Sequence, residues 1–410
     1  MKKQIIIIGA GPAGFFTAIH AASKNNKVII LEKNSEPGKK LLMSGSGQCN
    51  LTHSGEVEKL LNHYGDAERF LLGPLYSFSN NDLLNFFRER GIDFITTDDG
   101  KIFPASFNAR DILDTLLKEA SKQEVEIKYN TPVKDIEFIR AENKFLIRSA
   151  ENKYRADIVV LATGGNSYQT TGSTGDGYKL AAKFGHEIIE PKPALVSVNI
   201  NNYQFKDLAG ISLDNLMISL WRNERLIKKW QGDLLFTHKG LSGPGILNYS
   251  RYIKTEDIIK LRLVDIKNEA KLDKKLIDLI DKKGQRLFKN LIKELGLPER
   301  LGLKLMKLAE IPEKKQSAQL SKTERKMIGA LLYGLPLKVE KLDNFKEAMV
   351  TAGGISLNEI NPGTMESEKR PGLFAVGELL DIDGDTGGYN LQFAFSSGYL
   401  AGQEINQRTT

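Results

Sequence analysis

Four residues near the start of the chain have the types and the spacing of a dinucleotide-binding turn. Gly9, Gly11 and Gly14 follow the apolar run of residues 5–8, and Glu32 ends the next apolar run eighteen residues after the last of them. The first glycine permits a sharp turn after a strand, the second lets backbone approach a pyrophosphate, and the third lets a helix pack closely on a sheet. That helix offers free N–H groups to the phosphates, and Glu32 is placed to bond a ribose. The pattern predicts a dinucleotide that lacks a 2′-phosphate.

Two later segments have the composition expected around a flavin nucleotide. Residues 156–165 (ADIVVLATGG) form an apolar run that ends in small residues, where backbone passes close to a bulky group. Residues 371–402 predict a strand, an acid at Glu378, a glycine-rich loop and a helix that begins near Tyr389. With the first motif, they resemble the three-part FAD signature of glutathione-reductase-like flavoproteins, whose last motif covers the ribityl chain. Most members of that group have Asp where this chain has the longer Glu378. A resident nicotinamide would leave the last motif unexplained.

Longer strings narrow the resemblance to one family. GKKLLMSGSGQCNLTH (38–53), LLFTHKGLSGPGIL (234–247) and residues 350–390 resemble the HI0933-like family of bacterial flavoproteins. These are three-domain NAD(P)/FAD-dependent oxidoreductases, and they include bile-acid-reductase-like and aminoacetone-oxidase-like proteins. The resemblance covers essentially the whole chain and implies FAD as the cofactor. One position departs from the family pattern, because Gln48 replaces the usual Arg. A neutral amide does not bind an anion through two charged hydrogen bonds as a guanidinium does. The family resemblance therefore does not imply an anionic substrate for this chain.

The motifs and the resemblance together give a set of predicted FAD-binding residues. The resemblance implies that residues 38–47 wrap the phosphates or the ring face of the flavin. Lys39 and Lys40 either offset phosphate charge there or lie at the plain surface. Val133 is expected to contact adenine through its backbone. The predicted cofactor-binding residues are Gly9, Gly11, Pro12, Ala13, Gly14, Glu32, Lys33, Gly38, Lys40, Leu41, Ser44, Gly45, Asn50, Val133, Ala162, Thr163, Gly164, Gly377, Glu378, Gly387, Gly388, Tyr389, Asn390 and Leu391.

The source of electrons stays open between two alternatives. No second strand–GxGxxG–helix unit follows the first, and GSTGDG (172–177) has a different glycine order with no apolar strand leading directly into it. NAD(P)H would then visit the substrate cavity transiently, as the family resemblance favours. Otherwise an organic substrate would deliver the electrons and oxygen would reoxidise the flavin, as in an amine or amino-acid oxidase. In both cases a helix start near Gly388 would oppose the negative charge of the reduced flavin.

Side chains that could act on a substrate are few. His238, in a loop bounded by glycine, and Tyr389 are candidate proton donors, Cys49 is a candidate nucleophile, and Asn390 and His53 are further polar candidates. Each has a structural alternative: a histidine bonded to backbone, a tyrosine stacked on the flavin edge, or a cysteine that is a buried apolar residue. The five histidines show no ligand spacing, so the sequence predicts no metal site.

Composition favours a cytoplasmic enzyme with a small-molecule substrate. Hydrophobic residues make up 41% of the chain and charged residues 27%, which is ordinary for a soluble protein. Cys49 is the single cysteine, which excludes an intrachain disulfide. Lys2 and Lys3 precede only four isoleucines, which does not match a signal peptide. No apolar run approaches the roughly 18 residues that span a bilayer, so we expect no membrane partner.

Changes in pattern along the chain predict an α/β protein of three domains. Residues 1–193 and 344–410 are expected to form a Rossmann-like FAD-binding domain of the glutathione-reductase type. Strand-like runs in 194–267 and 327–343 predict an inserted antiparallel β domain. Residues 268–326 predict a small, basic helical cap domain.

The basic charge of the chain lies in that helical segment. Between Lys267 and Lys326 there are 17 Lys and Arg residues against nine Asp and Glu residues, so the rest of the chain is close to neutral. Phe288 is the only aromatic residue there, which leaves little for base stacking. We therefore expect solvated helix faces and do not expect nucleic acid as a partner. A flavin-holding factor that binds RNA or protein is the alternative from another class.

Shorter patterns predict individual elements. Apolar residues at helical spacing predict helices over 83–91 and 109–120, and residues 144–150 read as a strand. Ser321 and Glu324 have the spacing of a capping box, which predicts a helix start.

Overall fold

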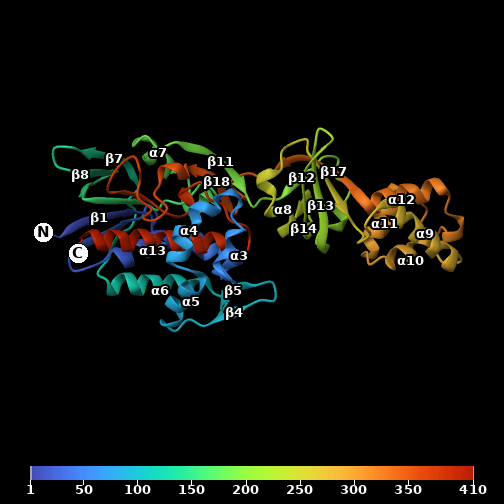
Figure 1. Cartoon of the computed structure of the whole chain (residues 1–410), viewed down its shortest axis with the longest axis horizontal. Helices are drawn as coiled ribbons and strands as arrows, with labels where there is room; N and C mark the ends of the chain where they lie inside the picture. Colours follow the sequence, from blue (N-terminus) through green and yellow to red (C-terminus); the bar gives the residue numbers. More distant parts are fainter. Residues whose placement is uncertain (1, 410) are drawn as a thin grey trace. The chain divides into compact units, whose positions relative to one another are not determined.

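The structure is a computed structural model that describes residues 2–409 (Figure 1), and its contacts divide the chain into two units. Unit 1 comprises Met1–Ala194 and Asn344–Thr410, and unit 2 comprises Leu195–Asp343. Each unit has its own cluster of buried apolar side chains.

Unit 1 is built on a five-stranded sheet in the order β19-β10-β1-β2-β6. Every neighbouring pair is parallel. The continuous isoleucine run of the first strand is buried because both faces of a parallel sheet are covered. The carboxyl ends of all strands meet at one edge, where the predicted cofactor motifs follow. The strands are β1 (Lys3–Ile8), β2 (Asn26–Leu31), β6 (Glu126–Lys128), β10 (Ile158–Leu161) and β19 (Leu373–Ala375).

Three smaller antiparallel sheets complete the strands of unit 1, in the orders β3-β5-β4, β7-β8-β9 and β11-β18. Their strands are β3 (Thr52–His53), β4 (Phe94–Thr96), β5 (Lys101–Pro104), β7 (Val133–Ile139), β8 (Lys144–Ser149), β9 (Lys153–Ala156), β11 (Ile188–Ala194) and β18 (Val350–Ile355).

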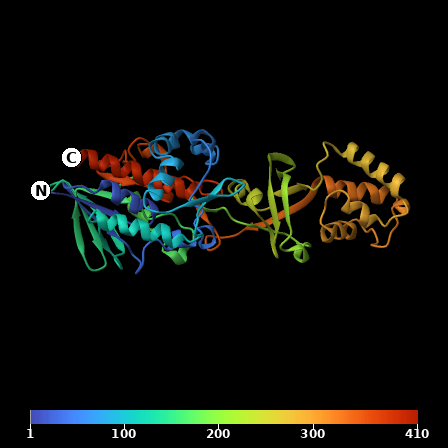
Figure 2. The same cartoon turned by 90° about the horizontal axis from the view of Figure 1, so that it is seen from below.

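A long C-terminal helix packs against the first helix of unit 1 (Figures 1 and 2). Close approach needs small residues here, because a Cβ on Gly398 would lie 2.5 Å from the Ala13 carbonyl oxygen. The helices of unit 1 are α1 (Pro12–Ala21), α2 (Lys39–Met43), α3 (Val57–Leu61), α4 (Glu68–Ser77), α5 (Asn80–Arg88), α6 (Ala109–Lys122), α7 (Asp176–Ala182) and α13 (Tyr389–Thr409).

Unit 2 contains a closed six-stranded antiparallel barrel in the order β12-β15-β14-β13-β16-β17. Pairing of β12 with β17 closes it. The strands are β12 (Val198–Ile200), β13 (Ser212–Arg222), β14 (Arg225–Phe236), β15 (Gly240–Ser242), β16 (Ile258–Arg262) and β17 (Leu335–Leu342). The helices are α8 (Pro244–Leu247), α9 (Glu269–Lys283), α10 (Phe288–Lys293), α11 (Glu299–Leu308) and α12 (Lys322–Gly334). The last of them contacts β16 and β17, and the helices share one buried cluster with the barrel. The residue bounds predicted for the β domain and the helical domain stay predictions.

The elements expected from short patterns are present. The helix expected over 83–91 begins earlier, because Ser79 and Asp82 form a capping box at the start of α5. The helix expected over 109–120 is α6, and the strand expected over 144–150 is β8. The capping box of Ser321 and Glu324 starts α12. Within residues 2–409 no helix is both long and apolar enough to cross a bilayer.

Candidate functional site

The turn between β1 and α1 has two crowded glycines and one open glycine. Gly9 has a φ of +109°, and a Cβ there would lie 2.5 Å from the Ala162 carbonyl oxygen. A Cβ on Gly14 would overlap the carbonyl oxygen of Gly9. A Cβ on Gly11 would meet no atom within 4 Å. Gly11 is also the N-cap of α1, whose first turn has no capping side chain and no acidic residue. The open side of this turn therefore presents free N–H groups, which suits an anion.

The carboxylate of Glu32 is fixed beside the same turn. The side chain is buried, with 7% of the residue exposed. One carboxylate oxygen accepts the Ala10 N–H at 2.8 Å, and the other accepts the backbone and side-chain amides of Asn34 at 2.8 Å each. The Thr131 N–H bonds the Glu32 carbonyl at 2.8 Å, which brings the start of β7 at Val133 to this strand end. A carboxylate has about four acceptor sites, so capacity remains for a hydroxyl group.

Two distant segments meet at the start of α13. With its amide oriented by its neighbours, Asn50 donates to the Thr52 carbonyl at 3.2 Å and accepts from the Gly388 N–H at 3.3 Å. Gly388 has a φ of +94°, and a Cβ there would lie 2.6 Å from Thr52 backbone atoms. The Thr52 hydroxyl donates to Gln392 at 2.6 Å. The structure thus brings the predicted segments 38–53 and 387–391 together.

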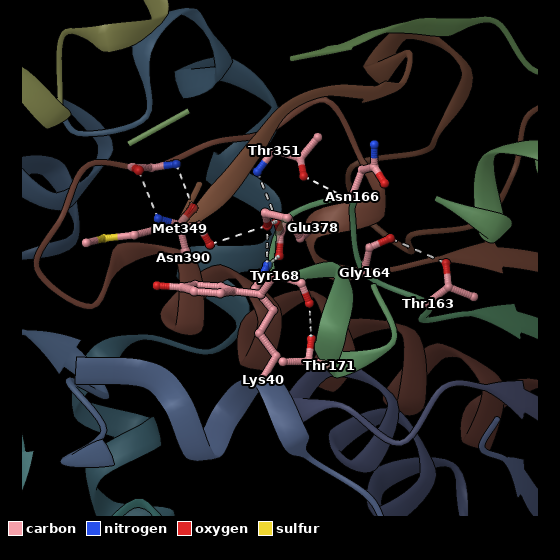
Figure 3. Close-up of polar contacts among 12 residues, drawn as sticks. Lys40, Thr163, Gly164, Asn166, Tyr168, Thr171, Met349, Thr351, Glu378 and Asn390 are labelled. Carbon is pink, nitrogen blue, oxygen red and sulfur yellow. Dashed lines mark hydrogen bonds and ion pairs between the residues drawn. The ribbon is translucent and has the colours of Figure 1, made fainter. Parts of the chain in front are cut away.

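Lys40 and Glu378 form an ion pair at the centre of a polar network (Figure 3). The Lys40 ammonium lies 2.5 Å from one carboxylate oxygen of Glu378 and 2.6 Å from the Ser167 hydroxyl. The other oxygen of Glu378 accepts the Ser167 hydroxyl at 2.8 Å and the Thr351 N–H at 3.0 Å. Ser167 and Thr351 are fully buried. The side chains of Lys40 and Glu378 are 25% and 17% exposed.

Tyr389 lies in a stack of aromatic rings. Its ring is 4.3 Å from that of His63 and 5.1 Å from that of His53, within 17° of parallel to both. The buried Tyr64 hydroxyl donates to the Tyr389 carbonyl at 2.8 Å. His63 in turn bonds the Asp385 carboxylate through Nδ1 at 3.0 Å. Burial, with a contribution from Asp385, raises the pKa of Tyr389, and only 2% of the residue is exposed. The ring packs the loop before α13, and a catalytic role for Tyr389 stays a prediction.

The other three candidate catalytic residues have separate environments. The Asn390 amide bonds both the N–H and the carbonyl of Gly384 at 2.8 Å, which closes the loop before α13. Cys49 is fully buried with a φ of +60°. Burial raises the pKa of its thiol to about 12, so the thiol is neutral and a weak nucleophile. His238 belongs to unit 2 and is an exposed residue between β14 and β15. Their catalytic roles stay predictions.

The remaining predicted cofactor residues border the same strand ends. Lys33 is engaged with Asp176 at 2.8 Å and with the Thr174 hydroxyl at 2.7 Å. Gly38 starts α2 and donates its N–H to the Ala10 carbonyl at 3.0 Å. Others lie in loops or first turns next to these elements: Pro12 and Ala13 in α1, Leu41 in α2, Ser44 and Gly45 directly after it, Ala162, Thr163 and Gly164 after β10, Gly377 after β19, Gly387 in the loop before α13, and Leu391 in α13.

Sequence analysis missed several residues of these networks. Ser167 lies two residues after the ATGG segment, so its position in the loop was the available signal. Thr351 has no such signal, because its N–H reaches Glu378 only through the position of β18. The His63–Asp385 pair joins residues 322 positions apart and has no local motif. Among residues 2–409, no cluster of three or more His, Cys, Asp or Glu side chains is arranged to hold a metal ion.

Comparison with known proteins identifies the family. Residues 3–404 match the HI0933-like protein Rossmann domain family. The chain belongs to the HI0933-like family. The resemblance drawn from the sequence is thus confirmed. The expected fold class is confirmed with it: a Rossmann-like FAD-binding domain with an inserted antiparallel β domain and a small helical domain. The chain is a flavoprotein of the oxidoreductase class.

Two relatives match this HI0933-like chain over almost its full length. The 3-dehydro-bile acid delta(4,6)-reductase of Clostridium scindens is 31% identical, over 99% of this chain and 100% of the relative. The ribosomal RNA dihydrouridine synthase of Escherichia coli is 29% identical, over 98% of each. A solved structure of 3-ketosteroid delta1-dehydrogenase from Sterolibacterium denitrificans has a TM-score of 0.52 at 12% identity, over 99% of this chain and 100% of that chain. At this identity it shows the fold alone.

Proposed function

We propose that this protein is an FAD-dependent reductase that adds two hydrogen atoms to a carbon–carbon double bond conjugated to a carbonyl group. The observation that carries the proposal is the chemistry common to the two full-length relatives. A delta-4 double bond beside a 3-oxo group is an enone. Dihydrouridine is uridine whose ring double bond, next to a carbonyl, is saturated. Both reactions add an electron pair at the carbon remote from the carbonyl.

The residues of unit 1 fit FAD. The open side of Gly11 and the free N–H groups of α1 suit a pyrophosphate, since a helix start favours negative charge. The fixed carboxylate of Glu32 suits ribose hydroxyls. When bound, FAD would supply the electron pair that side chains cannot provide. The sequence has no second strand–GxGxxG–helix unit for a resident nicotinamide nucleotide.

The start of α13 would act on the flavin ring. Gly387 and Gly388 lead into this helix with φ values of +126° and +94°, and the N–H groups of its first turn have no acceptor within the helix. A helix N-terminus stabilises nearby negative charge by about 0.3–1 kcal/mol when exposed and by up to about 2 kcal/mol when partly buried. The rings of His53, His63 and Tyr389 stack beside this helix start. With FAD bound, this helix start would favour the reduced form of the cofactor.

NAD(P)H is the proposed electron donor. The family resemblance supports it, and a transient visit needs no dedicated fold. An oxidase that takes electrons from an amine and passes them to oxygen is the alternative within enzymes. Anaerobic mixing with NADH or NADPH separates the two, since only the reductase loses its flavin absorbance without an organic substrate.

A uracil ring in RNA is the second candidate substrate for the same chemistry. The name of the Escherichia coli relative favours it, as does the surplus of positive charge between Lys267 and Lys326. Lysine side chains bind phosphate without base stacking, so this segment would contact the RNA backbone whatever its sequence.

The test is anaerobic reoxidation of the reduced, FAD-loaded protein. A 3-oxo-delta-4 steroid, a uridine-containing RNA and the saturated counterpart of each are added separately. We expect one unsaturated compound to restore the flavin absorbance and to gain two hydrogen atoms by mass spectrometry, while the saturated compounds do nothing. Reoxidation by oxygen alone, with bleaching by an amine, would contradict the proposal and favour the oxidase.

A further inference from the structure

We propose that one face of the barrel in unit 2 is a docking surface for single-stranded RNA, which it binds through the phosphate backbone. The face consists of the outward-pointing residues of 227–231 in β14, 217–221 in β13 and 258–262 in β16, three neighbouring strands. We call it the basic barrel face. The proposal rests on RNA as a candidate substrate in the proposed function and gives that RNA a place on the molecule.

Strand alternation and register decide which side chains share this face. In β13 the fully buried Ile218 and Leu220 point into the barrel, so Ser219 between them points outward. Ser219 pairs with Lys229 of β14 on one side and with Lys260 of β16 on the other. Residues directly opposite each other in neighbouring strands lie on the same face of a sheet. The two lysines therefore stand on the outer face of the barrel, on either side of β13.

The basic barrel face carries positive charge without a compensating acid. Its charged residues are Lys229, Lys260 and Arg262, and the three strand segments contain no Asp or Glu. Among residues 2–409, none of these three side chains forms an ion pair with a carboxylate. On the next strand, β17, Lys338 is by contrast paired with Glu256. Uncompensated cations on neighbouring strands attract a polyanion.

The basic helical segment between Lys267 and Lys326 differs in this respect. Its 17 cations are interspersed with nine Asp and Glu residues. Lys315 pairs with Glu324, for example, at 2.6 Å. The barrel face is therefore the more continuous positive surface of unit 2, although the helical segment has the larger total charge.

Two aromatic rings hold two of the three cations in place. The Lys260 ammonium lies 4.3 Å from the centre of the Trp221 ring, and the Trp221 Nε1–H donates to the Ser219 hydroxyl at 2.9 Å. The Arg262 guanidinium lies 4.5 Å from the centre of the Tyr333 ring and donates to the Tyr333 hydroxyl at 3.0 Å. A side chain that is already held loses less conformational entropy when it binds a partner. These cations are thus prepared for an anion.

The spacing of the charges suits a phosphate backbone. Lys260 and Arg262 are two residues apart on one strand, about 7 Å, and Lys229 lies two strand spacings from Lys260, about 9–10 Å. Single-stranded RNA carries one charge on every nucleotide and is flexible enough to follow such a row. Ile227 and Ile258, which are 45% and 36% exposed, add apolar surface that can contact bases. An acidic protein segment would match the charges but brings no bases to this apolar surface.

The experiment measures binding of a labelled, uridine-containing single-stranded RNA to the FAD-loaded full chain. Fluorescence anisotropy is recorded over a range of KCl concentrations, without an electron donor. The test variant combines Lys229→Gln, Lys260→Gln and Arg262→Gln. Each phosphate contact to a single strand contributes about 0.7 to the slope of log K against log salt concentration. We therefore expect a slope shallower by about 2 and at least tenfold weaker binding at low salt. Lys229→Gln alone, at an exposed position that cannot disturb the core, should reduce the slope by about 0.7.

A matched variant removes the same charge from unit 1. It combines Lys24→Gln, Lys118→Gln and Lys153→Gln, which change three exposed lysines. We expect it to keep the wild-type slope, because the effect should depend on the place of the charge and not on the net charge of the chain.

A second matched variant removes three exposed lysines from α9, through Lys274→Gln, Lys275→Gln and Lys282→Gln. We expect it to reduce the slope by less than the test variant does. A larger reduction than in the test variant would overturn the proposal and place the RNA on the helical segment.

Trp221 gives a signal from the face itself. RNA should change the tryptophan fluorescence of the wild-type chain but not that of Trp221→Phe, in which the buried Trp230 is the remaining tryptophan. A change that persists in Trp221→Phe would contradict the assigned place.

Three further results overturn the proposal: a wild-type chain that binds no RNA, an unchanged slope in the test variant, and equal displacement of RNA by polyglutamate at the same charge concentration. The last of these would favour an acidic protein as the partner. Binding as expected, by a reduced protein that no RNA reoxidises, supports the docking surface and overturns RNA as the substrate of the proposed function instead.

Discussion

The three glycines of the first turn have different neighbours, in keeping with the different role that the sequence motif gives to each. Gly14 is enclosed by backbone, whereas the position of a Cβ on Gly11 is open. Because Gly11 has a φ of −89°, alanine fits its backbone without strain. Substitution of Gly14 should therefore affect folding, whereas substitution of Gly11 should affect cofactor binding.

Gly11→Ala should leave the free energy of unfolding of the cofactor-free protein unchanged and weaken FAD binding by on the order of tenfold, about 1.4 kcal/mol, because the new methyl group enters the space that suits the pyrophosphate. Gly14→Ala should instead destabilise the fold by about 1–3 kcal/mol, as overpacking does. Chemical denaturation and FAD titration of both variants check this. Equal stability losses in the two variants would contradict it.

His20 gives unit 1 a pH dependence. Its ring packs against Phe16 at 5.1 Å and Tyr399 at 4.7 Å, and burial, with a contribution from Arg90, lowers its pKa from 6.5 to about 4. Between these values the unfolded chain binds more protons than the folded chain. The free energy of unfolding should therefore fall as pH drops from about 6.5 to 4, by up to about 3 kcal/mol. Denaturation of wild type and His20→Phe at several pH values in this range measures the difference between their free energies of unfolding. We expect that difference to change as the pH falls. A difference that stays constant would show that burial does not lower the pKa of His20.

At the scale of elements, local signals were sufficient for starts and turns. The capping box at Ser321, the helix start at Tyr389 and the strand–turn–helix at Gly9 each depend on residues within a few positions, and all three are present. Closure of the barrel depends on pairing Val198 with Leu342, far apart in the chain, so the sequence predicted antiparallel strands but not their closure. The Lys40–Glu378 pair was missed for the same reason.

The capping box of α12 supports a direct test of its helix. The Ser321 hydroxyl accepts the Glu324 N–H at 3.2 Å, and the Glu324 carboxylate accepts the Ser321 N–H at 2.9 Å. Ser321→Ala should lower the free energy of unfolding of unit 2 by about 1 kcal/mol. Thr323→Ala, at an exposed position in the same first turn, is the matched control and should have a smaller effect. Equal effects would show that the cap contributes nothing.

At the scale of the whole molecule, the two buried clusters are separate. One contains only residues of unit 1, and the other contains only residues of unit 2. The predicted cofactor residues all lie in unit 1, whereas His238 lies in unit 2. Separate cores favour separate unfolding transitions.

Calorimetry should therefore resolve two transitions, of which FAD raises only one. A ligand at a hundredfold excess over its dissociation constant stabilises the unit that binds it by about 2.7 kcal/mol. Ser321→Ala should lower the other transition. A single transition that both changes move would contradict the assignment of cofactor and cap to different cores.

Equilibrium titration of the purified protein with FAD tests the central claim most directly. The account predicts saturation at one FAD per chain, with a shifted flavin spectrum, and a clear loss of affinity in Gly11→Ala and in Glu32→Ala. A protein that keeps its fold but binds no FAD at excess, or one whose binding ignores both substitutions, would contradict it.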